Sequence, residues 1–131
     1  MPASTADQQL LESMRMISHN GSSLALEPGA VIFRAGDPGD CLYGVLSGSV
    51  RLTWGDGSQA EILGAGRCFG QGALVQPDHR RFGTATASEA TTLLVLQRPG
   101  VLFALEQLPM FGLQLLESTE RRLQHLRALT A

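Results

Sequence analysis

The sequence contains few of the residues on which disulfide frameworks and metal sites depend. Only two cysteines, Cys41 and Cys68, occur among its 131 residues. A disulfide framework needs more cysteines, and thiolate metal sites are usually built on closely spaced pairs. We therefore expect both thiols to be reduced and buried, as free cysteines usually are.

Catalytic and metal-binding patterns are equally sparse. The three histidines, His19, His79 and His125, share no ligand spacing with one another, with a cysteine or with a carboxylate. The His-x-His pattern of a cupin-type metal site is absent, and so is a G-x-S-x-G nucleophile elbow. We expect no catalytic residue, no metal and no cofactor, and hence no enzyme. A β-roll enzyme of cupin type is an alternative that metal analysis would decide.

Charge and long apolar runs are also scarce, which limits the expected partners. Charged residues make up 17% of the chain and the net charge is −2, whereas nucleic-acid-binding domains are usually basic. No basic, apolar leader opens the chain, and no apolar segment approaches the length of a membrane span. The sequence predicts a soluble, cytoplasmic protein with no membrane partner.

The chain opens with a predicted helix, and we assign residues 5–23 to this region. Thr5 and Gln8 fit a capping box, which starts a helix over residues 7–18. Apolar residues recur at helical spacing along it, so one face is expected to pack on the rest of the molecule. Asn20-Gly21 is predicted to end the helix.

Residues 24–97 change to strand patterning, with a glycine-rich turn after each short apolar run. Gly55-Asp56-Gly57 predicts a tight hairpin. The fold class predicted for this single domain, residues 1–131, is mainly β with flanking α: an antiparallel double-stranded β-helix, or jelly roll, of about eight strands. Strands are expected at 24–26, 31–34, 42–46, 49–54, 58–63, 84–87 and 91–96.

Two helices are predicted in the last segment, residues 98–131. Pro99 suits the first turn of a helix to about Leu108, and a longer helix begins at Pro109. We expect homodimerisation through residues 109–130, because a heptad-like seam runs along the long helix. The alternative is that this seam packs on the chain's own β roll. The seam positions are Gly112, Leu116, Thr119, Leu123, Leu126 and Thr130.

The stretch from Arg67 to Ala87 predicts an anion-binding cassette. It holds Phe69-Gly70-Gln71-Gly72-Ala73-Leu74 and then Arg80 and Arg81. Small residues let the backbone approach a ligand closely, and an arginine with free backbone amides suits a phosphate. Arg80 is interpreted as a surface residue.

Three motifs in this order resemble the cyclic-nucleotide-binding domain of catabolite-activator-like regulators, kinase regulatory subunits and gated channels. The first is LEPGAVIFRAGD at residues 26–37, the second is LYGVLSGSV at residues 42–50, and the third is the cassette. The resemblance covers about residues 10–129 and implies the same fold. It also implies a non-catalytic sensor that binds cyclic AMP, cyclic GMP or a similar phosphate-bearing molecule.

The resemblance also implies roles for particular residues. Gln71 falls on the position that accepts a bond from the ribose 2′-hydroxyl, and Arg81, ten residues later, falls on the phosphate position. Backbone amides at the start of a short helix complete the phosphate cradle. The ligand-binding residues expected in this way are Phe69, Gly70, Gln71, Gly72, Ala73, Leu74, Arg81, Phe82, Gly83, Thr84 and Arg127.

Several residues depart from the family pattern. Gln71 replaces a glutamate and so lacks a charge-assisted bond. Phe82 replaces a small residue and would either stack on a base or narrow the pocket. Arg127, after Leu126, would either stack on a purine or be solvated. These departures leave a second reading open, in which a degenerate domain without ligand serves as a dimerisation or adaptor module.

The chain ends at Ala131, with no helix-turn-helix after the long helix. We therefore expect no direct DNA binding. The output is expected to be dimer geometry or contact with an unidentified protein partner.

Overall fold

The computed structural model describes residues 2–18 and 23–130, so the predicted helix stop at Asn20-Gly21 lies outside the described residues. The first helix, α1, spans Thr5–Ser18. The capping box predicted at Thr5 and Gln8 is wrong by one residue. The Asp7 backbone N–H donates to Ser4 Oγ at 3.0 Å, and the Ser4 N–H donates to Asp7 Oδ2 at 2.8 Å. Ser4 and Asp7 have the same spacing, and they are the pair that satisfies the free N–H groups of the first turn.

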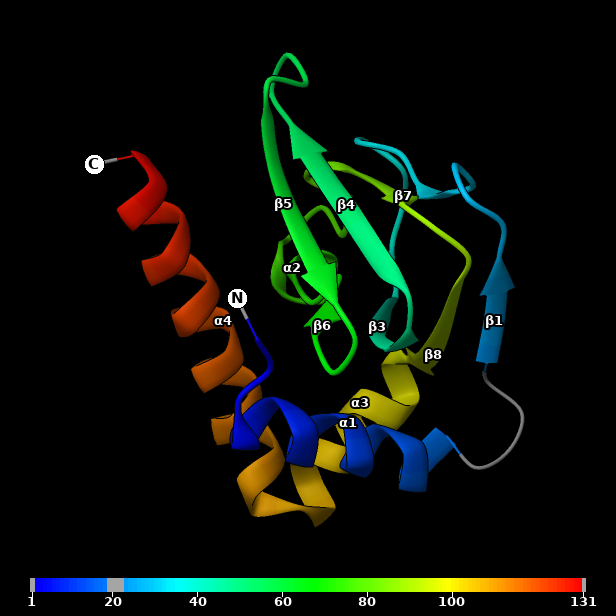
Figure 1. Ribbon diagram of the computed structural model, residues 1–131. Coiled ribbons are helices and arrows are strands. Elements are labelled where there is room, and N and C mark those ends of the chain that lie inside the picture. The colour runs from blue at the N-terminus through cyan, green and yellow to red at the C-terminus, as the bar shows by residue number, and fades with distance from the viewer. Residues whose placement is uncertain (1, 19–22, 131) are drawn as a thin grey trace.

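The β roll consists of two four-stranded antiparallel sheets among the described residues, as predicted for a jelly roll (Figure 1). One sheet has the order β1-β8-β3-β6 and the other β2-β7-β4-β5. The short strand β6, inside the cassette, was not predicted, because two residues give no periodicity. The strands are β1 (Ser23–Leu26), β2 (Val31–Phe33), β3 (Cys41–Ser47), β4 (Ser49–Trp54), β5 (Gln59–Gly64), β6 (Cys68–Phe69), β7 (Thr84–Ala87) and β8 (Thr91–Gln97).

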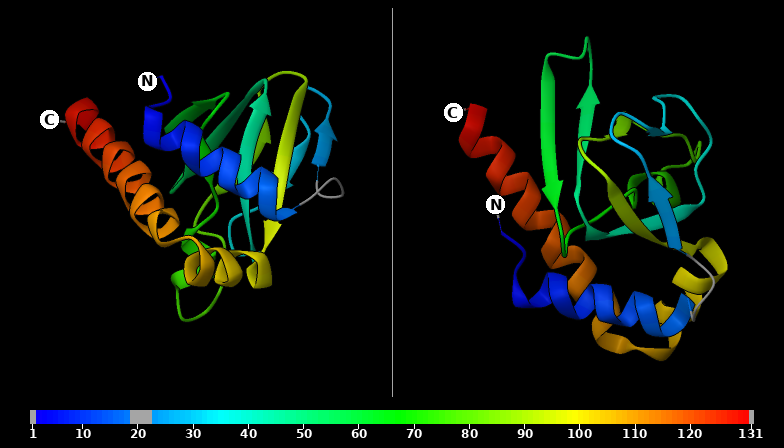
Figure 2. Two further views of the ribbon diagram at one scale, coloured as in Figure 1. Left: turned by 90° about the horizontal axis from the view of Figure 1, so that it is seen from below. Right: turned by 45° about the vertical axis from the view of Figure 1, so that its right-hand side comes forward.

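Three further helices complete the fold: α2 (Gly72–Val75), α3 (Arg98–Gln107) and α4 (Pro109–Thr130). In Figure 1, α1 crosses beneath the roll and α4 rises along the side of β5, and Figure 2 shows the same arrangement from two other directions. In the described part of the chain no helix alone is long and apolar enough to cross a membrane. The pair α3 and α4, bent by 116°, passes that test by length and composition only.

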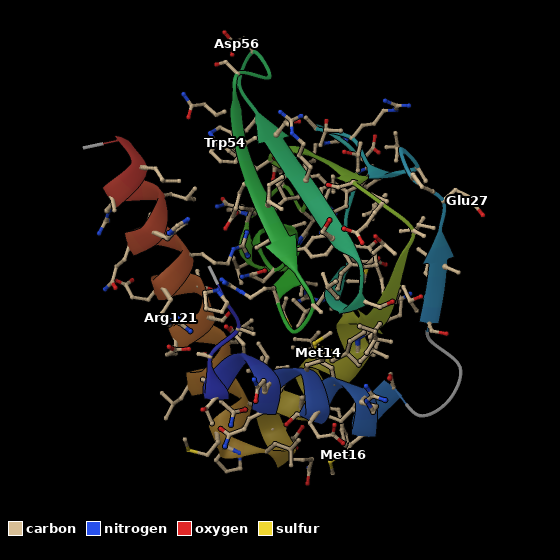
Figure 3. The ribbon with its side chains drawn as sticks, viewed as in Figure 1. Met14, Met16, Glu27, Trp54, Asp56 and Arg121 are labelled. Carbon is tan, nitrogen blue, oxygen red and sulfur yellow. The ribbon has the colours of Figure 1, made fainter. Side chains whose placement is uncertain are left out.

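The core has two parts. One lies between the two sheets and includes Val45, Val50 and Leu93, all fully buried. The other lies between the roll and the helices, where Met14 of α1 packs with Phe111 of α4. Figure 3 shows Met14 turned toward the roll and Met16 turned away. Met14 is accordingly fully buried, and Met16 is exposed. Burial of this apolar face holds α1 against the roll and the C-terminal helices.

A buried carboxylate ties three segments together beneath the cassette. Asp7 is fully buried, and its Oδ2 lies 3.5 Å from Arg67 Nε and 3.5 Å from Arg121 Nη1. Figure 3 shows Arg121 on α4 beside the first turn of α1. The same carboxylate therefore caps α1 and fixes the position of α4 relative to the loop that leads into the cassette.

Candidate ligand-binding site

A cavity of about 360 Å³ lies where the cassette, the β4–β5 hairpin and α4 meet. The β4–β5 register places Leu52 opposite Glu61, so both side chains share the face that looks into it. Trp54 stands near the end of the same hairpin (Figure 3). Most of the lining is apolar, with a few polar groups. The lining residues are Phe33, Leu52, Thr53, Trp54, Glu61, Gly70, Gln71, Gly72, Ala73, Arg81, Phe82, Gly83, Thr119, Arg122, Leu123 and Leu126.

Arg81 is held rigidly in the wall of this cavity. Its side chain donates from Nη1 to the Gly70 carbonyl oxygen at 2.8 Å and from Nη2 to the Cys41 carbonyl oxygen at 3.2 Å. The guanidinium carbon lies 4.4 Å from the centroid of the Phe33 ring, a cation–π distance. Only 5% of Arg81 is exposed, and its Nε has no hydrogen-bond partner among the described residues.

No described carboxylate forms an ion pair with Arg81. The surroundings are instead aromatic and neutral. Burial raises the pKa of the Tyr43 hydroxyl, and a hydrogen bond with Cys41 raises it further. Tyr43 therefore stays neutral beside the guanidinium and supplies no counter-charge.

Gln71 stands between the cavity and α4. Its Nε2 donates to Thr119 Oγ1 at 2.9 Å. Its Oε1 is buried and has no hydrogen-bond partner in the part of the chain that the structure describes.

A second polar contact joins α4 to the roll. Arg122 donates from Nε and Nη2 to the two carboxylate oxygens of Glu61, at 2.9 and 2.8 Å. It also donates from Nη1 to the Cys68 carbonyl oxygen at 3.1 Å. Glu61 is 7% exposed, so this bidentate pair is largely removed from solvent and fixes α4 over the cavity.

The structure brings seven of the expected ligand-binding residues to the cavity. These are Gly70, Gln71, Gly72, Ala73, Arg81, Phe82 and Gly83. Phe82 does not fill the cavity, because 82% of it is exposed. Phe82 nevertheless lines the cavity, so both interpretations of its ring, stacking on a base and narrowing the pocket, stay predictions.

The other four expected residues lie elsewhere. Phe69 is fully buried and stacks on Tyr43, with 5.1 Å between ring centroids. Leu74 packs on the core beneath the helices. Thr84 Oγ1 accepts from the Ala35 N–H at 3.0 Å. Arg127 is exposed and does not line the cavity.

The long helix contributes more to the cavity than the sequence indicated. Three of the six predicted seam positions, Thr119, Leu123 and Leu126, line the cavity of the chain's own roll. Glu61 and Arg122 were not predicted at all. The signal for Glu61 was the hairpin register, which places it on the inner face with Leu52. For Arg122, the sequence offered no signal.

Among the described residues, no three His, Cys, Asp or Glu side chains come together as a metal site would require. Burial raises the pKa of the Cys68 thiol to about 12, which keeps it protonated and unsuited to metal binding or nucleophilic attack.

Comparisons with known proteins agree with this fold. The cyclic AMP receptor protein of Thermus thermophilus is 37% identical over 100 residues, which make up 73% of this chain and 46% of that protein. The chain therefore spans less than half the length of this relative. The crystal structure of the Thermus thermophilus catabolite activator protein is 31% identical with a TM-score of 0.73, covering 91% of this chain and 57% of that chain.

A third structure is similar over nearly its whole length. It comes from a study of a cyclic-GMP-dependent signalling pathway that regulates bacterial phytopathogenesis. Its TM-score is 0.79, with 95% of this chain and 98% of that chain covered. At 23% identity this likeness concerns the fold alone. The model of the cyclic nucleotide-binding domain family matches residues 23–108, and the chain belongs to that family.

Proposed function

We propose that the cavity binds a 3′,5′-cyclic nucleotide and that the chain acts as a non-catalytic, ligand-sensing regulatory module. The observation that carries this proposal is Arg81, a guanidinium that is 5% exposed and has no carboxylate partner among the described residues. Burial of an uncompensated charge is unfavourable. A cyclic phosphate carries one negative charge and supplies the missing partner through charge-assisted hydrogen bonds.

The rest of the cavity suits a nucleoside. Leu52, Trp54 and Leu126 offer an apolar surface for a base, and Gln71 offers an acceptor for a sugar hydroxyl. The volume of about 360 Å³ lies within the usual range of small-molecule sites, roughly 300–1,000 Å³. The name of the Thermus thermophilus relative, which mentions cyclic AMP, supports the same class of ligand.

The reading of a degenerate, ligand-free adaptor was based on Gln71 and Phe82, and Phe82 filling the cassette would favour it. Phe82 lies at the surface of the site instead, and the cavity behind it stays open. This observation supports ligand binding over the adaptor.

We propose further that the sensor is a cytoplasmic homodimer that pairs through residues 109–130 and signals through α4, to its twin or to another protein. Leu113, Leu116 and Leu123 are exposed on α4, by 58, 67 and 40%. Their spacing of three and seven residues gives an apolar seam that a second copy would bury. The buried, unpaired thiols of Cys41 and Cys68 suit a reducing compartment. In sedimentation velocity, Leu116→Glu is expected to convert the dimer into a monomer, whereas a monomeric wild type would refute the seam.

Titration calorimetry with cyclic AMP and cyclic GMP tests the binding proposal. Wild-type protein is expected to bind at least one of them, and Arg81→Leu to weaken that binding at least about tenfold, since hydrogen bonds to charged groups are lost. Arg80→Leu is the matched control, because Arg80 is exposed, does not line the cavity, and its side chain donates to the Gly36 carbonyl oxygen at 2.8 Å. The absence of heat from folded wild type with both nucleotides, or an unchanged affinity in Arg81→Leu, would refute the proposal.

A further inference from the structure

The carbonyl oxygen of Ala73, in α2, cannot find a donor in its own helix. A helical carbonyl accepts from the N–H four residues later, and the residue four places after Ala73 is Pro77, which has no N–H. The donor comes from the turn that follows the helix, where His79 Nδ1 lies 2.8 Å from this oxygen. Because a carbonyl oxygen only accepts, Nδ1 carries the proton and donates it.

The backbone of His79 has a conformation that few residues other than glycine adopt. Its φ is 51°, and every other positive φ among the described residues belongs to a glycine. Histidine and asparagine occur in this left-handed region more often than most residues, but the conformation is still unfavourable. Such a conformation persists where neighbouring contacts hold it, and these cases concentrate at binding sites. The bond to Ala73 is one such contact.

A second bond joins His79 to the turn between β2 and β3. The Gly39 N–H donates to the His79 carbonyl oxygen at 2.8 Å. Gly39 lies between Ala73 and Arg81, since a Cβ built on it would collide with the guanidinium and lie 2.9 Å from the Ala73 Cβ. His79 therefore holds Ala73 with its side chain and Gly39 with its backbone.

His79 does this from outside the nucleotide site. Ala73 and Arg81 line the cavity of about 360 Å³, whereas His79 does not. Its side chain is exposed and lines a separate cavity together with Gly39. An effect of His79 on a ligand in the first cavity must therefore pass through the residues that it holds.

We propose that His79 is a positioning residue for the anion site: its two bonds hold the part of the cavity wall in which the Arg81 guanidinium lies. This inference rests on the proposed function, which assigns the cyclic phosphate to Arg81. Without the imidazole, α2 is no longer tied to the turn that leads to Arg81. The order lost in this way has to be restored when the nucleotide binds, and that cost lowers the affinity.

Titration calorimetry of the full chain with cyclic AMP and cyclic GMP tests this role. His79→Gly accepts a φ of 51° without strain but lacks the imidazole. Its urea midpoint is expected to stay close to that of the wild type, while its affinity for the nucleotide that binds falls about fivefold. Gln76→Ala is the matched control and is expected to bind like the wild type, because Gln76 is exposed in the same turn and does not line the cavity.

The conservative variant His79→Asn separates the hydrogen bond from the rest of the side chain. Asparagine tolerates the left-handed conformation, and its amide nitrogen is attached to Cγ as Nδ1 is, so it can donate to Ala73 in the same way. This variant is expected to keep the wild-type affinity to within about twofold.

A measurement on the ligand-free protein needs no nucleotide. The Nε of Arg81 is buried, has no hydrogen-bond partner among the described residues and lies against Gly39. Exchange of its proton with water, followed by ¹⁵N NMR, therefore reports how firmly the wall is closed. We expect this exchange to be at least about threefold faster in His79→Gly and unchanged in His79→Asn.

Each outcome bears on the positioning role. Wild-type affinity in His79→Gly, or a fivefold loss in His79→Asn, overturns it. A large fall of the urea midpoint in His79→Gly also overturns it, because His79 would then serve the fold as a whole. In an Arg81→Leu background, His79→Gly is expected to cause little further loss of affinity, and a full fivefold loss there would show that His79 does not act through Arg81.

Failure of the proposed function is distinguishable from failure of this inference. If folded wild type binds neither nucleotide, the proposed function is refuted. The exchange of the Arg81 Nε proton in the ligand-free variants then decides by itself whether His79 holds Arg81, and equal rates in His79→Gly and wild type would overturn that.

Discussion

The guanidinium of Arg81 lies directly against the backbone of Gly39, with no room for a side chain between them. A Cβ built on Gly39 would collide with Arg81 Nε and Cζ, and it would lie 2.9 Å from the Cβ of Ala73. The absence of a side chain at Gly39 therefore allows the arginine to lie in the cavity wall, where it bonds to Gly70 and Cys41.

The first prediction follows from this contact. Gly39→Ala is expected to displace the Arg81 side chain and to weaken nucleotide binding at least about tenfold, because the hydrogen bonds of the guanidinium depend on its position. Stability is expected to fall by about 1–3 kcal/mol, as in other overpacked sites. Calorimetry and urea unfolding measure the two effects. Gly64→Ala is the control, since a Cβ there meets nothing within 4 Å; equal binding by both variants would contradict the prediction.

The second prediction concerns the ion pair between α4 and the hairpin. Arg122→Met leaves the Glu61 carboxylate, 7% exposed, without its bidentate partner. Loss of one member of a buried pair typically costs about 3–5 kcal/mol, and Glu61 here stays close to the cavity solvent, so we expect about 3 kcal/mol in urea unfolding. The double variant Glu61→Leu/Arg122→Met removes both charges and is expected to recover much of this loss. A double variant less stable than Arg122→Met would show that the pair is not the cause.

The third prediction concerns Asp7, which both caps α1 and bridges Arg67 and Arg121. Asp7→Ala removes both functions and is expected to destabilise the fold by about 3–5 kcal/mol. Ser4→Ala removes the side chain that caps the Asp7 N–H and is expected to cost about 1 kcal/mol. Equal losses in the two variants, measured by thermal or urea unfolding, would mean that the ion pairs contribute nothing.

The sequence predicted the architecture of the roll, because strands and turns depend on local signals. Glycine turns and alternating apolar residues marked the strands of the roll. The resemblance to the cyclic-nucleotide-binding family, through the ten-residue interval between Gln71 and Arg81, implied that both contact one ligand, and both line the cavity.

The remaining features depend on contacts between segments far apart in the sequence. Arg122 meets Glu61, 61 residues away, and nothing local to either residue indicates the other. The capping box at Ser4 could not be told from the one at Thr5, since Asp7 and Gln8 complete the two patterns equally well. The rotation of α4 that turns Thr119 toward the cassette is set by packing, so the heptad pattern alone did not reveal it.

The last prediction concerns alkaline pH. Burial, with a smaller contribution from the nearby Asp7 carboxylate, raises the pKa of the Cys68 thiol from 9.0 to about 12. Below pH 9.0 the thiol is protonated in the folded and unfolded states, so its contribution to stability is complete. Between pH 9.0 and about 12 the unfolded thiol ionises while the folded one keeps its proton. The folded state then binds more protons, so stability falls as the pH rises.

Removal of the Cys68 thiol should reduce the loss of unfolding free energy at alkaline pH. We expect the free energy of unfolding of the wild type to fall more steeply than that of Cys68→Ala, by up to ~1.4 kcal/mol per pH unit for one proton. Tyr43, whose pKa burial also raises, titrates in both proteins and cancels in the comparison. Urea unfolding at a series of pH values from 8 to 11, under reducing conditions, measures these slopes. The difference between the slopes of the two proteins is expected to correspond to ~1 proton. Parallel plots of unfolding free energy against pH for the two proteins would mean that the Cys68 thiol ionises alike in the folded and unfolded states. That result would contradict the burial of Cys68 against Met14, where the Cys68 Sγ lies 3.5 Å from the Met14 Sδ.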